Sequence, residues 1–177
     1  MQPPLDEGDG HVDKGPYVSA TFSPLHLISP IFELQIEGRV VPHFGIAVIG
    51  GIGSIKSEAT VSGVDSQKFS AYELGTQLVG YPLQPFDSLQ LGAELMWIHV
   101  GTETFQGQEI KANAGGVAIG PLIGYKLLTK VGFTFFVQGG FQYVAVKANA
   151  SDNAGNAASA KQSAFIPLLN LNIGWSF

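Results

Sequence analysis

Apolar side chains occur at every second position along much of the chain. Between Phe165 and Phe177 the odd-numbered positions are all apolar, whereas the even-numbered ones include Asn170, Asn172 and Ser176. Successive side chains of an extended chain point to opposite faces, so this period of two predicts a strand that separates two unlike environments. Turn-forming residues divide the chain into eight such segments, and strands are predicted near residues 17–28, 31–41, 44–55, 68–81, 88–100, 115–128, 132–147 and 163–177.

Each predicted strand has one apolar and one polar face. In residues 31–41 the apolar face begins with Phe32 and Leu34, and the polar face begins with Glu33 and Gln35. If the apolar face pointed inward, as in a lipocalin-like soluble barrel, the outer surface would be rich in glycine and poor in charge. If it points outward, it meets lipid while barrel closure pairs the backbone groups. The sequence therefore predicts an all-β fold, an eight-stranded antiparallel up-and-down transmembrane β-barrel.

The composition agrees with this fold. Only 13% of the residues are charged, against about 25% in soluble domains, and 23 of the 177 residues are glycine. No run approaches the ~20 apolar residues that a membrane helix needs. The chain has no cysteine, which excludes disulfides and thiolate metal sites. A formal charge of −5 argues weakly against nucleic acid as a partner.

The predicted connections are of two kinds. Short ones lie at residues 41–43, 82–87 and 129–130, and longer polar ones lie at 54–67, 101–113 and 148–162. This alternation is typical of periplasmic turns and external loops, with both termini on the periplasmic side. The first external connection, at Ser29-Pro30, is almost absent, so the rim is expected to be low there.

Residues 1–16 are rich in proline and acidic side chains and are expected to form a flexible periplasmic lead to a barrel domain at 17–177. Folding of this lead back into the lumen is the alternative. Met1 is followed by Gln-Pro-Pro-Leu, without the basic and apolar regions of a secretory signal. We therefore expect a mature sequence without its signal peptide, to which a start methionine was added; a natural cytosolic protein is the alternative.

Aromatic side chains fall near both ends of the predicted strands. Once strand directions alternate, the periplasmic end carries Tyr17, Phe44, Tyr125, Phe133, Trp175 and Phe177, and the external end carries Phe32, Phe69, Tyr72, Trp97, Tyr143 and Phe165. Amphipathic rings prefer the headgroup level of a bilayer, so two aromatic girdles are expected. Aromatic residues that only filled a soluble core would not cluster at strand ends.

The strand order, the loop pattern and the final aromatic strand together resemble the eight-stranded outer-membrane barrels of the OmpA/OmpX-like superfamily. The resemblance covers residues 17–177, and the segment 32–55 is similar to small outer-membrane β-barrel domains. It implies a porin-like monomer in the bacterial outer membrane, in contact with the lipid bilayer and lipopolysaccharide. In that family the insertion machinery recognises the terminal strand and its phenylalanine. Trp175 and Phe177 are therefore the expected insertion signal.

The polar face places six charged residues in the lumen, namely Glu33, Glu37, Glu73 and Glu94 against Arg39 and Lys126. Eight strands enclose only enough space for their own side chains, and buried unpaired charges are costly, so a shared network is expected. In the predicted register Arg39 contacts Glu37, the periplasmic half of the lumen is basic and the external half is acidic. The two excess negative charges are to be met by water, protonation or a bound cation. A narrow cation path and a catalytic carboxylate pair are the alternatives to a self-satisfied plug.

The histidines give little support to an enzyme. Lipid-modifying barrel enzymes need a histidine beside a serine to activate the hydroxyl, and none of His11, His26, His43 and His99 stands in the His-x-Ser pattern of the barrel deacylases. His26 and His99 could still lie together near the external rim with Ser29. We expect no enzymatic activity, no cofactor and no metal site.

The glycine runs at 50–56 and 120–126 do not give the phosphate-binding pattern GxxxxGK[ST] and indicate tight curvature or close packing instead. Three function classes remain. A structural or surface-interaction barrel with a plugged lumen is favoured. A narrow channel or a lateral-diffusion transporter for small or hydrophobic solutes, as in OmpW-like relatives, is the alternative. A lipid-modifying enzyme is the weakest, and the partner of the external loops is not identified.

Overall fold

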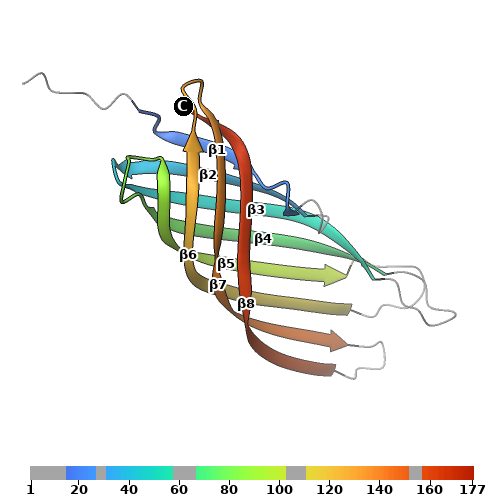
Figure 1. The fold of residues 1–177 in the computed structure, drawn as a ribbon. Helices are drawn as coiled ribbons and strands as arrows, with labels where there is room; N and C mark the ends of the chain where they lie inside the picture. The colour runs from blue at the N-terminus through green and yellow to red at the C-terminus, as the bar shows by residue number, and fades with distance from the viewer. Residues whose placement is uncertain (1–14, 27–30, 58–66, 103–110, 152–156) are drawn as a thin grey trace, which may run out of the picture.

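The computed structural model describes residues 15–26, 31–57, 67–102, 111–151 and 157–177. Within them the chain forms the strands β1 (Val18–Phe22), β2 (Ile31–Val41), β3 (Phe44–Ser57), β4 (Gln67–Gly80), β5 (Ser88–Thr102), β6 (Lys111–Leu128), β7 (Phe133–Ser151) and β8 (Ala157–Ser176). Each strand is antiparallel to the next, and β1 also pairs with β8, so the sheet closes into an up-and-down barrel (Figure 1). The predicted all-β fold, an eight-stranded antiparallel up-and-down barrel, is therefore confirmed. Among the described residues, no helix is both long and apolar enough to cross a membrane.

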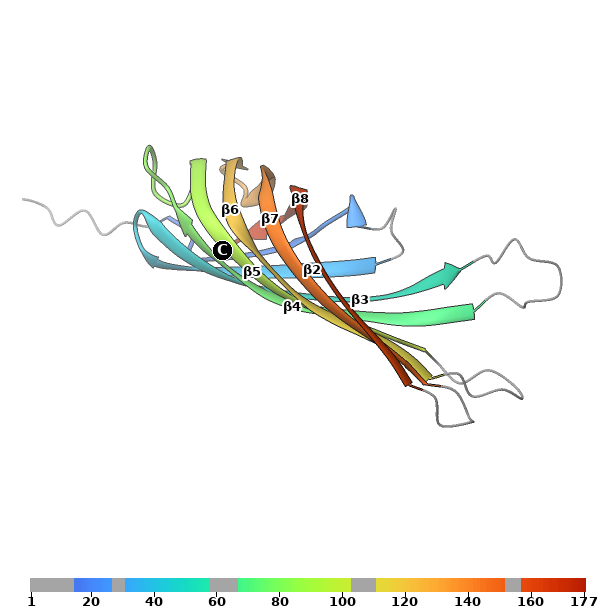
Figure 2. The same cartoon turned by 90° about the horizontal axis from the view of Figure 1, so that it is seen from below.

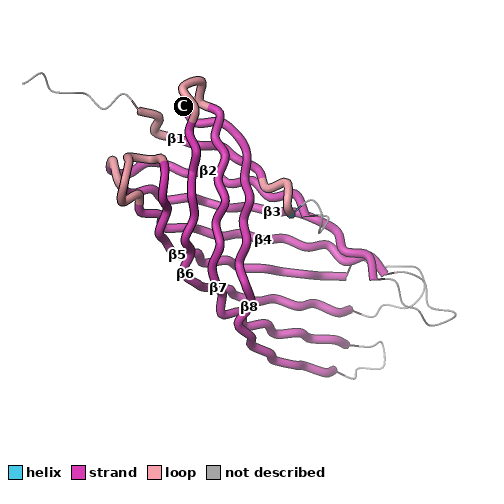
Figure 3. The backbone as a smooth tube through the Cα atoms, viewed as in Figure 1, coloured by secondary structure: helices cyan, strands magenta, loops and turns pink. Residues whose placement is uncertain are grey.

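The strand ends match the prediction at one end of the barrel and extend beyond it at the other. β2 has the predicted bounds, and the β4–β5 and β6–β7 turns, pink in Figure 3, lie at the same end. At the opposite end β6 begins at Lys111, β7 ends at Ser151 and β8 begins at Ala157. Antiparallel pairing between β7 and β8 continues through these polar segments. Backbone pairing does not need apolar alternation. The loops predicted from the alternation at 101–113 and 148–162 therefore include residues that belong to strands.

The first strand is shorter than predicted. The sequence indicated a strand at 17–28, but β1 ends at Phe22 and the chain turns at 24–26. Pro24 has no backbone N–H and a fixed φ, so it cannot continue a ladder. Pairing between β1 and β8 is limited to residues 19–22 against 173–176. Figure 2 shows β3 and β4 extending beyond β2 at the loop end, so the rim is uneven.

The apolar face of the sheet points outward, as predicted. In β3, Ile46, Val48 and Ile52 are exposed and Phe44 is half-buried, whereas Ala47 and Ile49 point inward and are buried. The buried polar side chains of the inner face include Glu33, Gln35, Glu37, Gln77, Gln90, Glu94, Lys126, Gln138, Gln142, Asn170 and Asn172. This orientation excludes the lipocalin-like arrangement, in which the apolar face would line the interior.

Two small apolar clusters lie among the buried residues. Tyr81 and Phe86 flank the β4–β5 turn and pack with Val79 at the turn end, where the ring centroids of Tyr81 and Phe86 lie 5.6 Å apart. The second cluster lies farther toward the loop end and consists of Ile49, Met96 and Ala118, with Ile98 and Val144 packed against it. Apolar side chains therefore occupy part of the interior at two levels, between the buried polar residues.

Glycine permits close approach between neighbouring strands. A Cβ added at Gly120 would overlap the carbonyl oxygen of Phe141 on β7, whereas a Cβ at Gly38 would meet nothing within 4 Å. Gly132, in the β6–β7 turn, has a φ of +87°, a conformation that L-residues with a side chain rarely adopt. The glycine runs of β3 and β6 lie within strands rather than in phosphate-binding loops.

Candidate functional site

The turn end of the lumen is built around Lys126. Its Nζ donates hydrogen bonds to Oε2 of Glu37 at 2.8 Å, Oγ of Ser19 at 2.9 Å and the hydroxyl oxygen of Tyr81 at 3.3 Å. It also lies 3.6 Å from the ring centroid of Phe86, in a cation–π contact. Tyr81 donates its hydroxyl hydrogen to Glu37. The only charge pair of the described lumen at this end is thus dry and enclosed, with Lys126 fully buried.

The middle of the lumen is a layer of side-chain amides. Gln77 and Asn170 donate to the Glu94 carboxylate at 2.5 and 3.1 Å, and Gln142 donates to its second oxygen. Gln138 in turn donates to the amide oxygen of Gln90 at 3.0 Å. The Glu94 carboxylate therefore accepts hydrogen bonds from three neutral donors. These donors take the place of the cation that the excess of carboxylates in the predicted lumen would otherwise require here.

The loop end of the lumen carries His26, Glu33 and Glu73. Nδ1 of His26 lies 2.8 Å from Oε2 of Glu33, and Glu33 is only 3% exposed. The interaction with the Glu33 carboxylate raises the pKa of His26 above its ordinary value, against the opposing effect of burial. Oε1 of Glu73 is buried and has no hydrogen-bond partner. The three side chains come from the turn after β1, from β2 and from β4.

The expected contact between Arg39 and Glu37 is wrong, because Lys126 takes that place. Arg39 lies at the rim of the turn end, where its Nη2 donates to the carbonyl oxygen of Gly15 at 3.2 Å and its guanidinium lies 4.2 Å from the ring centroid of Tyr17. The register of β2 against β3 shifts between Arg39 and Val41. At this rim the long side chain reaches the chain before β1 instead of the enclosed lumen.

Sequence reasoning did not identify Tyr81 as a lumen residue. The alternation places Tyr81 at the end of the predicted strand 68–81 and assigns it no contact. In the structure its hydroxyl group contacts Glu37, Gln90 and Lys126. The alternation did indicate an inward side chain, because Gln77, Val79 and Tyr81 are two residues apart and share one face. What the pattern could not show is that Tyr81, one residue beyond the end of β4, contacts Glu37 and Lys126.

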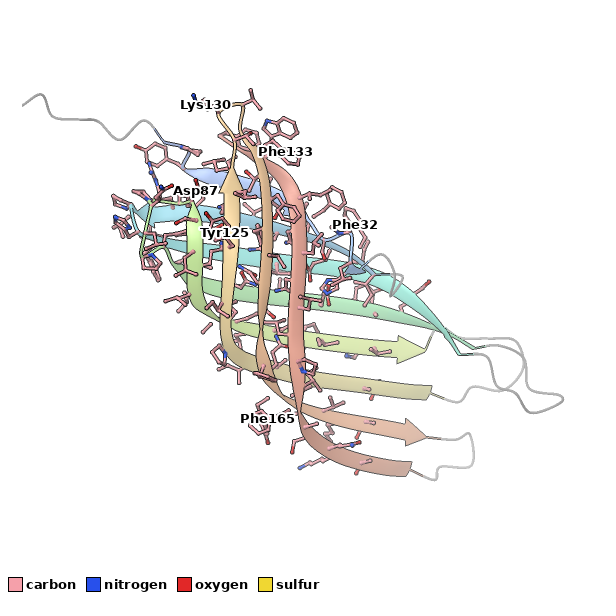
Figure 4. The ribbon with its side chains drawn as sticks, in the orientation of Figure 1. Phe32, Asp87, Tyr125, Lys130, Phe133 and Phe165 are labelled. Atoms are coloured by element: carbon pink, nitrogen blue, oxygen red, sulfur yellow. The ribbon has the colours of Figure 1, made fainter. Side chains whose placement is uncertain are left out.

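The predicted girdle residues lie on the outer surface. Tyr17, Phe32, Tyr72, Trp97, Tyr125, Phe133, Tyr143, Trp175 and Phe177 are all exposed, and Phe44 is half-buried. Figure 4 shows Phe133 beside the β6–β7 turn with Lys130, and Phe165 farther toward the loop end. Phe133 packs edge-on against Trp175 with centroids 5.6 Å apart, and Tyr143 packs against Phe165 at 5.3 Å. Their girdle and insertion roles remain predictions.

The histidines do not gather into a catalytic group. His26 contacts Glu33 inside the barrel, whereas His99 stacks on the outward ring of Trp97 with centroids 5.7 Å apart. His43 lies at the opposite end, with its Nδ1 2.6 Å from the carbonyl oxygen of Tyr81. His26 and His99 both lie toward the loop end but on opposite faces of the sheet, so these two histidines do not form the pair that the enzyme alternative needs. His11, Ser29 and the lead at 1–14 lie outside the described residues.

Two hollows lie near the loop end, one on each face of the sheet. The outer hollow, of about 490 Å³, is lined by Trp97, Gly115, Gly116, Val117, Ala145, Val146, Lys147, Lys161, Gln162 and Ser163. The inner hollow, of about 290 Å³, is lined by Val144, Val146, Ala148, Ala160, Gln162, Ser163, Ala164 and Ile166. The outer one combines aromatic and ammonium groups, and the inner one is almost wholly apolar.

Comparisons with known proteins give no family. Neither a protein-family model nor a curated protein matches the chain. Two solved structures align with it over 92% of this chain and 98% of theirs. They are CarO2 of Acinetobacter baumannii, with 12% identity and a TM-score of 0.43, and a major outer membrane protein of Thermus thermophilus, with 12% identity and a TM-score of 0.46. Membership of the OmpA/OmpX-like superfamily stays a prediction.

Proposed function

We propose that the chain is an integral, monomeric outer-membrane β-barrel with a plugged lumen, acting through its outer surface and external end. The difference between the outer and the inner face of the barrel wall supports this proposal. Most outward side chains of the strands are apolar and exposed, whereas most of the large buried side chains are polar and hydrogen-bonded to one another. In lipid this arrangement costs nothing, because hydrocarbon meets only apolar side chains. In water it would expose an apolar belt far larger than soluble monomers tolerate.

The filled lumen favours a structural role over conduction. Lys126, Tyr81 and Phe86 are at most 1% exposed and occupy the turn end of the interior. Above them Gln77, Glu94, Gln138 and the amide residues around them form a continuous hydrogen-bonded layer. An ion would have to displace both layers to cross. This agrees with the general rule that eight strands enclose space only for their own side chains.

Planar-bilayer conductance of the refolded protein tests this proposal. We expect no steady conductance from the wild type, together with a heat-dependent shift in gel migration that reports a folded barrel. Glu94→Gln serves as the probe, because Glu94 is the carboxylate of the amide layer. Steady cation-selective openings that change in this variant would establish a channel and refute the plugged lumen. A protein that stays monomeric in water without detergent would refute the membrane location.

The outer hollow suggests which lipid the external end contacts. Lys147 and Lys161 are directly paired across β7 and β8, on the outward face and beyond the rings of Tyr143 and Phe165. Two ammonium groups in this position repel each other. An anionic headgroup between them would relieve the repulsion, while Trp97 and Val117 contact the acyl chains. We therefore propose a phosphate-bearing lipid of the outer leaflet, such as lipopolysaccharide, as the partner of this face.

A second candidate function rests on the inner hollow. Val144, Val146, Ala164 and Ile166 make its surface apolar. Beside it, no described residue of β1 pairs with β8 beyond the Phe22–Ile173 pair. A hydrophobic solute entering from the external end would find an apolar wall there and, next to it, a stretch of barrel wall without strand pairing. Lateral diffusion into the bilayer is therefore the alternative to a purely structural role.

A matched pair of substitutions separates the two hollows. Ala164 lines the inner hollow and Ala145 the outer one, on adjacent strands. Ala164→Trp should abolish binding of a hydrophobic fluorophore to the detergent-solubilised barrel, and Ala145→Trp should leave it unchanged. Ala145→Trp should in turn reduce retention of lipopolysaccharide. Equal effects of both variants on the fluorophore, or none, would contradict the lateral-diffusion candidate.

A further inference from the structure

The described lumen carboxylates that are paired with neither an ammonium group nor side-chain amides lie in one place. Among the described residues, Glu37 is neutralised by Lys126 and accepts a hydrogen bond from Tyr81. Glu94 accepts hydrogen bonds from three side-chain amides. The remaining carboxylates, Glu33 and Glu73, lie together at the loop end of the lumen. The basic group in contact with this pair is the imidazole of His26, which meets Glu33.

The three side chains are arranged as a set of metal ligands. One imidazole nitrogen of His26 and one carboxylate oxygen each of Glu33 and Glu73 all lie within 4.8 Å of one another. Ligand atoms around a tetrahedral zinc ion lie roughly 3.4 Å apart, as zinc–ligand distances near 2.1 Å require. The 2.8 Å separation between His26 Nδ1 and Glu33 Oε2 and the 4.8 Å upper limit bracket that value.

Two further observations point to a ligand at this place. Oε1 of Glu73 is buried without a hydrogen-bond partner, and an unsatisfied buried carboxylate oxygen is costly. Opposite Glu73 stands Gly51, where an added Cβ would overlap the carboxylate. Because Gly51 has no side chain, the Glu73 carboxylate can occupy this space. His26 is 27% exposed, so the site is reached from the loop end.

We propose that His26, Glu33 and Glu73 bind a divalent first-row transition-metal ion, with zinc as the representative. One imidazole nitrogen and two carboxylates suit such an ion, whereas calcium and magnesium prefer oxygen ligands alone. The fourth position is open to water from the loop end. The ion neutralises the two carboxylates and ties the turn after β1 to β2 and, past Gly51 of β3, to β4. It thereby fastens the end of β1, which with five residues is the shortest of the described strands.

The sequence predicts no metal site because these ligands have no recognisable spacing. His26 follows Pro24 in a segment predicted as strand, and Glu73 lies forty residues after Glu33 on a different strand. The early end of β1 turns the His26 side chain toward Glu33. The site is therefore a product of the barrel closure rather than of a local motif.

Zinc titration of the folded protein in detergent, by isothermal calorimetry, tests the proposal. We expect one zinc ion per chain, with calcium and magnesium unable to compete. Glu73→Gln and His26→Asn should each weaken binding by at least roughly tenfold, the loss found even for residues behind metal ligands. His99→Asn is the matched control, because His99 faces outward at the same end, and it should bind zinc like the wild type.

Three results would overturn the proposal. They are no zinc binding by the wild type, unchanged affinity in both ligand variants, and equal competition by calcium. Folding of each variant is checked by heat-dependent gel migration. Because a variant could fail to fold, X-ray absorption of the zinc-loaded wild type gives a second readout, and a first shell without an imidazole would equally refute the assignment.

Discussion

Removing the buried ammonium of Lys126 should be among the most destabilising single changes in the barrel. Lys126 is fully buried, and its Nζ donates to Glu37, Ser19 and Tyr81. In Lys126→Met the Glu37 carboxylate keeps only the hydrogen bond from Tyr81 among these contacts. Stranding one partner of a buried ion pair costs roughly 3–5 kcal/mol of unfolding free energy, because the remaining charge is neither solvated nor paired.

The double variant Lys126→Met with Glu37→Gln separates this cost from lost packing. It removes the stranded charge and should recover most of the stability lost in the single variant, since apolar replacements of both partners are often neutral. Lys130→Met, at an exposed position in the β6–β7 turn, is the matched control and should unfold like the wild type.

Equilibrium unfolding in urea, with the barrel inserted in lipid vesicles, measures these effects. Trp97 and Trp175 lie on the outer face, so their fluorescence reports loss of contact with lipid. A Lys126→Met barrel within about 0.5 kcal/mol of the wild type, the usual range for surface changes, would refute the reasoning. It would mean that water reaches Glu37 and that the turn end of the lumen is not dry.

Three further changes test other parts of the structure. Arg39→Ala should lower the unfolding free energy by less than about 1 kcal/mol, because Arg39 lies at the rim and contacts Gly15 and Tyr17; a loss as large as that of Lys126→Met would place it back in the network. Phe177→Asp should slow membrane insertion in cells, because its side chain is 68% exposed on the outer face; wild-type insertion kinetics would remove Phe177 from the insertion signal. Gly120→Ala should cost about 1–3 kcal/mol through overlap with Phe141, and Gly38→Ala should not; equal urea midpoints for the two would contradict the close approach.

The alternation of side chains was sufficient to predict which residues face inward. A slip of one residue would have moved every side chain of a strand to the other face, and the short turns at the turn end fix the register. Glu33, Gln35 and Glu37 are buried as their parity requires, while Phe32 and Leu34 between them are exposed. Parity failed where a proline intervened, because Pro24 ends β1 and the residues after it no longer alternate between the two faces.

Parity does not determine which inward side chains meet. Arg39 is two residues from Glu37, yet the partner of Glu37 is Lys126, 89 positions away on β6. That choice depends on how the strands are staggered around the closed ring and on the inward fold of the β4–β5 turn, and neither leaves a local signal in the sequence. Counting charges predicted an excess of two carboxylates. The structure shows which two carboxylates these are. Glu94 accepts hydrogen bonds from amides, and Glu37 is paired with an ammonium group. Glu33 and Glu73, beside His26, are therefore the lumen carboxylates that a bound cation would neutralise.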